Sequence, residues 1–234
     1  LESRLSVHSA GYSASALQSA SSGDAAVLGR MIGEPREGPF RILVSAPLQV
    51  GFAAAVLPCI PYNDPDHPVY AVLGHWLSSG PLWEKIRTTG GAYGAFSYPD
   101  SLEDLFVLAT YRDPAPLQSL SVFRAVLEEA SIRPFDPLSL EKTITGCYSR
   151  EIQPRSPSDK GFTAFIRLLY GITDEVRRAK VSRIVSVQPA EMQACAKRLA
   201  DSWKDVKEVV LAGDKMIKGD GKRVFSGNVV RMIL

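Results

Sequence analysis

Arg87 and Tyr93 are the residues of this chain whose types and spacing are best suited to a catalytic or binding role. They flank the double glycine Gly90-Gly91, and Gly94 follows directly. Glycine permits a positive φ angle or the close approach of another backbone. A guanidinium and a phenol on either side of such a bend can reach one oxyanion or carbonyl from two directions. The segment therefore predicts a site that binds a carbonyl group or stabilises negative charge.

Other catalytic patterns are missing from the sequence. The histidines are His8, His67 and His75, and no two of them form an H-E-x-x-H or H-x-x-E-H zinc motif. There is no G-x-S-x-G elbow and no G-x-x-x-x-G-K-[ST] phosphate loop, and the glycines near Tyr93 do not fit G-x-G-x-x-G. We therefore expect the chain alone to bind no metal and to be catalytically inactive.

Composition and charge exclude further classes of function. The chain has 234 residues, 45% of them hydrophobic, and a net charge of +2, so no basic field indicates a nucleic-acid partner. No apolar run is long enough to span a membrane, and no signal-peptide pattern opens the chain. The three cysteines share no metal-type spacing and predict reduced, mostly buried thiols: Cys59, Cys147 and Cys195. These features indicate an intracellular protein with neither membrane nor nucleic acid as partner.

The elements that must position Arg87 and Tyr93 follow from the hydrophobic pattern. Apolar, partly β-branched or alternating runs predict five strands at 40–45, 49–57, 92–98, 104–111 and 208–212. One-sided apolar spacing predicts helices at 69–77, 82–86, 117–130, 138–152, 162–170, 174–184 and 189–199. The apolar stripes at 117–130 and 162–169 are expected in the core. Because the order is not a strict strand–helix alternation, we predict an α+β fold. It is a two-layer sandwich with a mostly antiparallel sheet and helices packed on one face.

A domain boundary is expected near residue 38. Residues 33–39 are rich in glycine and proline, which interrupt regular structure, and residues 1–37 are too small and polar to form a core. The chain does not begin with methionine, which indicates a mature form or part of a longer protein. We therefore predict that residues 1–37 are the end of a preceding domain with its linker, and that residues 38–234 form one domain.

The stretch from Leu82 to Gly94, followed by Thr110-Tyr-Arg-Asp-Pro114, resembles the C-terminal half of pitrilysin/insulinase-type zinc peptidases, in the presequence protease and falcilysin branch. Further similarity lies in the proline-containing loop at 154–157, in the helix start at Gly171 and in the strand region around Val50–Phe52. Together these matches cover roughly residues 40–200 in the same order.

The resemblance implies a clamshell of two halves, each with two similar α+β domains. Zinc and the H-x-x-E-H helix belong to the first domain, which is not present here, and the last domain encloses a chamber for unstructured peptides. By position, Arg87 and Tyr93 would bind the substrate backbone and stabilise the oxyanion, with Gly90 and Gly91 beside the substrate. The implied partners are the N-terminal catalytic half of the same protein and peptide substrates. An extended peptide added edgewise to the strand after Tyr93 is a further expectation.

Alternatives remain open at this stage. The same fold serves as an inactive scaffold or assembly domain in the core subunits of respiratory complexes. Arg87 could be a surface arginine favoured at a helix C-terminus, and Tyr93 a packed strand residue. The Tyr111–Pro114 segment would then be architectural, with Arg112 and Asp113 paired, and Trp83 would be a packing residue.

Overall fold

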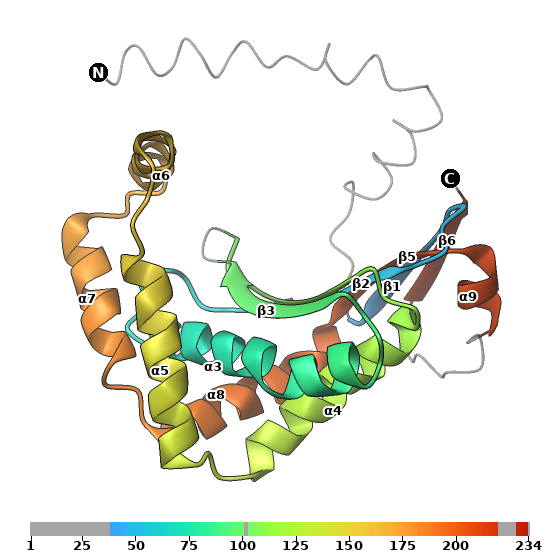
Figure 1. The fold of residues 1–234 in the computed structure, drawn as a ribbon, viewed down its shortest axis with the longest axis horizontal. Helices are drawn as coiled ribbons and strands as arrows, with labels where there is room; N and C mark the ends of the chain where they lie inside the picture. The colour runs from blue at the N-terminus through green and yellow to red at the C-terminus, as the bar shows by residue number, and fades with distance from the viewer. Residues whose placement is uncertain (1–37, 101–102, 220–227, 234) are drawn as a thin grey trace. The chain divides into compact units, whose positions relative to one another are not determined.

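The computed structural model describes residues 38–100, 103–219 and 228–233, and Gly38–Leu234 forms a compact unit of its own. Its centre is a six-stranded sheet with the order β3-β4-β2-β5-β1-β6 (Figure 1). The strands are β1 (Phe40–Ser45), β2 (Phe52–Pro58), β3 (Gly94–Asp100), β4 (Leu105–Tyr111), β5 (Lys207–Ala212) and β6 (Asn228–Ile233). The predicted segment 1–37 lies outside the described residues, so its assignment to a preceding domain stays a prediction.

Strand pairing divides the sheet into an antiparallel and a parallel part. The β3–β4, β4–β2 and β2–β5 pairs are antiparallel, whereas β1 runs parallel to both β5 and β6. The mostly antiparallel sheet is thus confirmed. The parallel pairs arise because β5 and β6 come from the end of the chain and lie on either side of β1. The sequence pattern did not reveal β6.

Helices pack on one face of this sheet. The helical segments of the described residues are α3 (His67–Ser79), η2 (Trp83–Thr88), α4 (Pro116–Ile132), α5 (Pro137–Ile152), α6 (Pro157–Leu169), α7 (Asp174–Ile184), α8 (Pro189–Asp201), η3 (Ser202–Asp205) and α9 (Asp214–Gly219). α3 packs on β3 and α4 packs on β2, while α8 packs against both helices (Figure 1). The predicted α+β sandwich is therefore confirmed.

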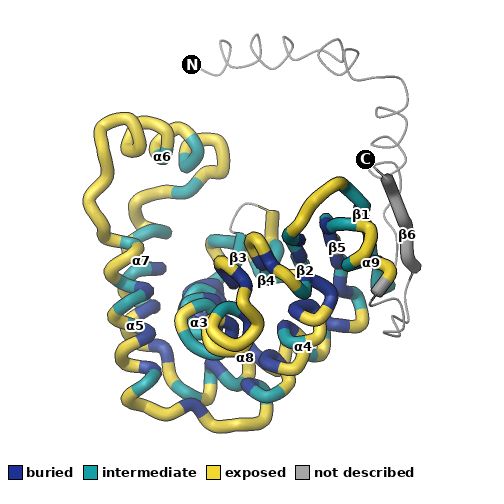
Figure 2. Tube along the Cα trace, turned by 45° about the vertical axis from the view of Figure 1, so that its right-hand side comes forward, coloured by how far each residue is buried: buried dark blue, intermediate teal, exposed yellow. Residues whose placement is uncertain are grey.

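Burial alternates along the strands, as expected when only one face is covered. Ala55, Leu57, Phe106 and Leu108 point into the helical layer and are fully buried, whereas their strand neighbours are half-buried or exposed (Figure 2). The buried side chains of α4 meet them, as the stripe at 117–130 predicts. The opposite face of β2, β3 and β4 carries no helix among the described residues.

The prediction that the stripe at 162–169 belongs to the core is wrong. No residue of α6 is buried, and the helix lies at the far end of α5 and α7, away from α3, α4 and α8 (Figures 1 and 2). The amphipathic pattern correctly predicts a helix but does not say what covers its apolar side.

Within the part of the chain described, none of the helices combines the length and the apolar character that a membrane crossing requires.

Candidate functional site

The turn between η2 and β3 fixes where Arg87 and Tyr93 lie. η2 has π-helical hydrogen bonding and ends where Thr89 N–H donates to Glu84 C=O. Gly91 follows with φ +79°, a conformation that favours glycine. A Cβ at Gly90 would lie 2.6 Å from the carbonyl oxygen of Ile86, so that position is also restricted to glycine. Both glycines are thus explained by backbone geometry, and contact of either with a substrate stays a prediction.

Arg87 and Tyr93 lie close together across this turn. The Cζ atom of Arg87 is 3.9 Å from the ring centroid of Trp83 and 5.7 Å from that of Tyr93. Such stacking holds a guanidinium in one plane without neutralising its charge. Arg87 forms no ion pair with any carboxylate among the described residues. Its N–H donors therefore remain available for a carbonyl or an oxyanion.

Tyr93 is an exposed phenol supported by other rings. Its side chain is 65% exposed, and its ring meets Tyr111 edge-on at 5.9 Å between centroids. Tyr111 in turn meets Phe52 at 5.5 Å. The backbone N–H of Tyr93 donates to the carbonyl of Arg112 over 3.3 Å, which attaches the start of β3 to the end of β4. Tyr93 is thus held from below while its hydroxyl faces away from the core.

An aromatic surface continues from Tyr93 across the open face of the sheet. Phe96 and Tyr98 are 48% and 45% exposed and alternate along β3 on that face. Phe96 is opposite Ala109 of β4, and Tyr98 is opposite Val107. Small and β-branched neighbours leave the rings accessible. The arrangement suits contact with the apolar side chains of an extended chain.

The outer edge of β3 is less accessible than its face. The N–H of Ser97 donates to the hydroxyl of Ser78 over 2.7 Å, and that hydroxyl lies 3.0 Å from the carbonyl oxygen of Ser97. Both outward-facing backbone groups of Ser97 are therefore occupied by α3. Pro99, two residues on, has no N–H to offer. A peptide added edgewise along β3 would have to displace Ser78, which argues against that expectation.

The segment Tyr111–Pro114 is architectural, but not through the predicted pairing of Arg112 with Asp113. Asp113 is buried, and its carboxylate accepts hydrogen bonds from the Ser119 hydroxyl at 2.6 Å and from the Ala115 N–H at 2.8 Å. Arg112 is exposed and has φ +50°. The carboxylate therefore stabilises the turn into α4, while the bend at Arg112 brings its carbonyl to Tyr93.

The histidines give no metal site in the described residues. No group of three or more His, Cys, Asp or Glu side chains there is arranged to hold a metal ion. His75 is half-buried, and Nδ1 of its ring lies 3.4 Å from the Arg150 guanidinium. Burial, assisted by that charge, lowers the pKa of His75. The residues present thus do not fit the zinc that the family resemblance implies for the intact protein.

The cysteines are free thiols. Burial raises the pKa of Cys59 and of Cys147 to about 11, and burial also raises the pKa of Cys195. Thiols with raised pKa values are poor nucleophiles at neutral pH. They therefore take no part in the site.

Sequence reasoning found Arg87 and Tyr93 but missed what supports them. Trp83 was expected to be a packing residue, yet it is 45% exposed and its ring carries the guanidinium of Arg87. The spacing of four residues between Trp83 and Arg87 on a helical segment was the available signal. Tyr111 could not be found in this way, because its contact with Tyr93 depends on strand pairing.

Comparison with known protein families shows to which family the chain belongs. The model of the PreP C-terminal domain matches residues 60–214, which include the turn, β3, β4 and α6. The chain belongs to the PreP C-terminal domain family. The mitochondrial presequence protease of Saccharomyces cerevisiae is 28% identical over 175 residues, covering 73% of this chain and 17% of that protein. The Schizosaccharomyces pombe protein of the same name is 31% identical over 152 residues, covering 65% and 15%.

Solved structures agree on the fold. A structure described as the peptidase M16 inactive domain from Pseudomonas fluorescens aligns with a TM-score of 0.62 at 14% identity, covering 77% of this chain and 45% of that one. A putative zinc protease from Bordetella pertussis aligns with a TM-score of 0.58 at 18% identity, covering 71% and 95%. This PreP C-terminal domain therefore has the fold of an M16 peptidase domain of the inactive type. It spans about a sixth of the length of the curated relatives it matches.

Proposed function

We propose that this chain is the non-catalytic C-terminal domain of a zinc metallopeptidase that degrades unstructured peptides. Arg87 and Tyr93 bind the substrate and stabilise the oxyanion at the cleavage point. The observation that carries the proposal is the stacking of the half-buried Arg87 between Trp83 and Tyr93, without a carboxylate partner among the described residues. The zinc belongs to the catalytic half, as the chemistry of zinc-protease relatives suggests.

The physical argument concerns charge that develops during peptide cleavage. When a carbonyl carbon becomes tetrahedral, its oxygen gains negative charge, and donors already aimed at it stabilise the transition state. The Arg87 guanidinium supplies charge and the Tyr93 hydroxyl supplies a neutral donor. Because aromatic contacts orient both groups in advance, little reorganisation is needed at the moment of reaction.

The open face of the sheet supports the choice of an extended peptide as substrate. The rings of Phe96 and Tyr98 continue from Tyr93 along one side of β3, whereas Ser78 occupies the edge of that strand. In our proposal the peptide lies over this face. It thereby brings its backbone to Arg87 and Tyr93, and its apolar side chains rest on the rings.

The test is peptide cleavage by the complete enzyme, with this chain joined to or mixed with its catalytic half. We expect Arg87→Ala and Tyr93→Phe each to lower kcat for an unstructured fluorogenic peptide by about 10²–10³-fold. Arg133→Ala, at an exposed arginine on the helical side, is the matched control and should leave kcat unchanged. Full activity of both site variants would instead assign the domain to a scaffold role.

The proposed compartment follows the named relatives, which are mitochondrial presequence proteases. We place the protein inside the cell, in an organelle matrix. Protease protection of the protein in isolated organelles, lost only when the inner membrane is opened, is the expected result.

A further inference from the structure

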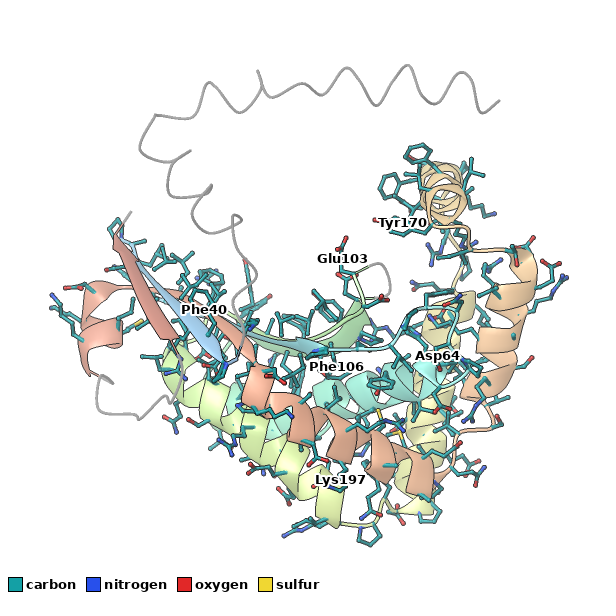
Figure 3. All side chains as sticks on the ribbon, turned by 180° about the vertical axis from the view of Figure 1, so that it is seen from behind. Phe40, Asp64, Glu103, Phe106, Tyr170 and Lys197 are labelled. Carbon is teal, nitrogen blue, oxygen red and sulfur yellow. The ribbon has the colours of Figure 1, made fainter. Side chains whose placement is uncertain are left out.

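Helix α6 presents an apolar face that no described part of the domain covers. Five neighbouring large side chains are each about half or more exposed: Phe162 67%, Phe165 51%, Leu168 67%, Leu169 55% and Tyr170 48%. With roughly 100 Å² accessible on each, the face amounts to something on the order of 500 Å². Apolar patches of that size on a folded domain mark interaction sites. Figure 3 shows Tyr170 at the end of this helix, far from Lys197 on α8.

The helix is formed without packing against the core. Ser156 caps its start by accepting the N–H of Asp159, and the Arg155 guanidinium donates to the Thr163 hydroxyl at 2.6 Å. Its end is closed by the N–H of Ile172, which donates to the carbonyl of Arg167 over 2.9 Å. A helix of 13 residues is marginal by itself in water, so these caps matter.

The helices that precede and follow α6 are fixed to the core. α5 and α7 both pack on α3, and the buried ammonium of Lys180 on α7 forms an ion pair with Glu151 on α5 at 3.0 Å. Ile184 and Cys147 bury the contact between these helices and the core. α6 is therefore connected at both ends to helices that pack on the core.

A cavity beneath α6 indicates which charge the occupant of the apolar face carries. It has a volume of about 670 Å³, and Tyr62, Phe162 and Ile166 supply its apolar lining. Its charged lining residues are Arg155, Arg167 and Asp159, two cations against one carboxylate, and we call this part the cationic rim. Partial burial and the nearby charge of Arg177 lower the pKa of Arg167, while Tyr62 and Asp174 act in the opposite direction. The occupant should therefore combine apolar side chains with carboxylates.

We propose that the apolar face of α6 is the docking surface for the catalytic half of the protease. This inference rests on the proposed function, in which the domain works with such a half. The family match includes α6, so the helix is part of the shared domain. The curated relatives carry about five-sixths of their length outside the matched segment, which supplies a large partner. The docking segment of that half is apolar and flanked by acidic residues.

The experiment places a photoreactive benzoylphenylalanine at position 165 by Phe165→benzoylphenylalanine in the complete enzyme. After irradiation, mass spectrometry should find the crosslink on an apolar, acid-flanked segment of the catalytic half. A crosslink to a second copy of this chain, a crosslink only to added peptide substrate, or no crosslink would each overturn the proposal.

A matched pair of charge reversals tests the cationic rim. Arg167→Glu should lower the crosslink yield several-fold, whereas Lys160→Glu, on the same helix but outside the cavity lining, should not. Circular dichroism checks that helix content is retained in both variants. Equal yields in the two variants would contradict the predicted acidic partner. Arg87→Ala should leave the crosslink intact, so a failure of the proposed function is distinguishable from a failure of this docking surface.

Discussion

At the scale of single residues, the position of Arg87 depends on Trp83. The indole lies under the guanidinium at 3.9 Å and is itself partly exposed, so it contributes little to the core. A stacked arginine keeps its donors directed outward while its charge is attracted by the ring. We therefore propose that Trp83 is a positioning residue, acting on the substrate through Arg87.

Replacing Trp83 tests this role. Trp83→Ala should lower kcat for peptide cleavage by the complete enzyme by about 2- to 30-fold, which corresponds to a cation–π contribution of roughly 0.5–2 kcal/mol. Trp83→Phe keeps a ring under the guanidinium and should recover part of that loss. Equal activity of the alanine and phenylalanine variants would show that stacking does not position Arg87.

The sequence indicated that Arg87 and Tyr93 lie close together, but not what surrounds them. Arg87 and Tyr93 lie within one turn, so their proximity follows from the glycines between them. Tyr111 approaches Tyr93 only because β3 pairs with β4, a contact between residues 18 positions apart in the chain. Such pairings depend on strand register, which a single sequence specifies weakly.

At the scale of elements, the edge of β3 is closed by α3. The Ser78 hydroxyl binds both backbone groups of Ser97 and also lies 2.9 Å from the carbonyl oxygen of Gly74. Exposed sheet edges invite pairing with other chains, and a side chain that occupies them limits such pairing. The closed edge leaves the aromatic face as the accessible side of the strand.

Hydrogen exchange can test the closed edge. In Ser78→Ala the amide of Ser97 should exchange about 5- to 30-fold faster, because a lost hydrogen bond of about 1–2 kcal/mol exposes it to water. Ser79→Ala is the control, since its hydroxyl binds the carbonyl of His75 and does not touch β3. Unchanged exchange at Ser97 would mean that another group protects the edge.

Most elements were predictable because their patterns are local. The strand at Phe40–Ser45 was predicted at its observed bounds, and the helix predicted at 174–184 is α7, which Thr173 caps by accepting the N–H of Val176. β6 was missed, since its pairing with β1 joins the two ends of the domain. The burial of α6 was mispredicted because periodicity reports an apolar face without reporting its partner.

At the scale of the whole domain, one buried histidine links stability to pH. His67 is fully buried, and neither of its ring nitrogens has a hydrogen-bond partner among the described residues. Burial, reinforced by the charge of Lys180, lowers the pKa of His67 to about 4, although Glu151 and Asp64 act in the opposite direction. Tyr62 covers the ring at 5.3 Å between centroids.

The sign of the effect follows from proton uptake. An unfolded histidine binds a proton near pH 6.5, whereas the folded one stays neutral until about pH 4. The free energy of unfolding should therefore fall as the pH falls through this window, by roughly 3 kcal/mol. Urea titrations between pH 7 and pH 4 should show a smaller fall for His67→Phe. Parallel curves for the two proteins would assign the acid sensitivity to other groups.

Two surfaces of the domain have different proposed functions. In our proposals the open face of the sheet and the turn at Arg87 bind the substrate and α6 binds the partner, while α3, α4 and α8 fill the layer beneath the sheet. A domain built in this way contributes to catalysis only when another half brings the reacting centre to it. Its value to the enzyme then lies in stabilising the transition state.

The most direct measurement compares a tetrahedral, anionic phosphinic peptide with the matching substrate in the complete enzyme and in Tyr93→Phe. If Tyr93 stabilises developing charge, the Kd of the phosphinic peptide should rise by the same factor as kcat/KM falls, about 10²–10³-fold, while substrate affinity changes little. Unchanged affinity for the phosphinic peptide alongside a lower kcat/KM would contradict the account.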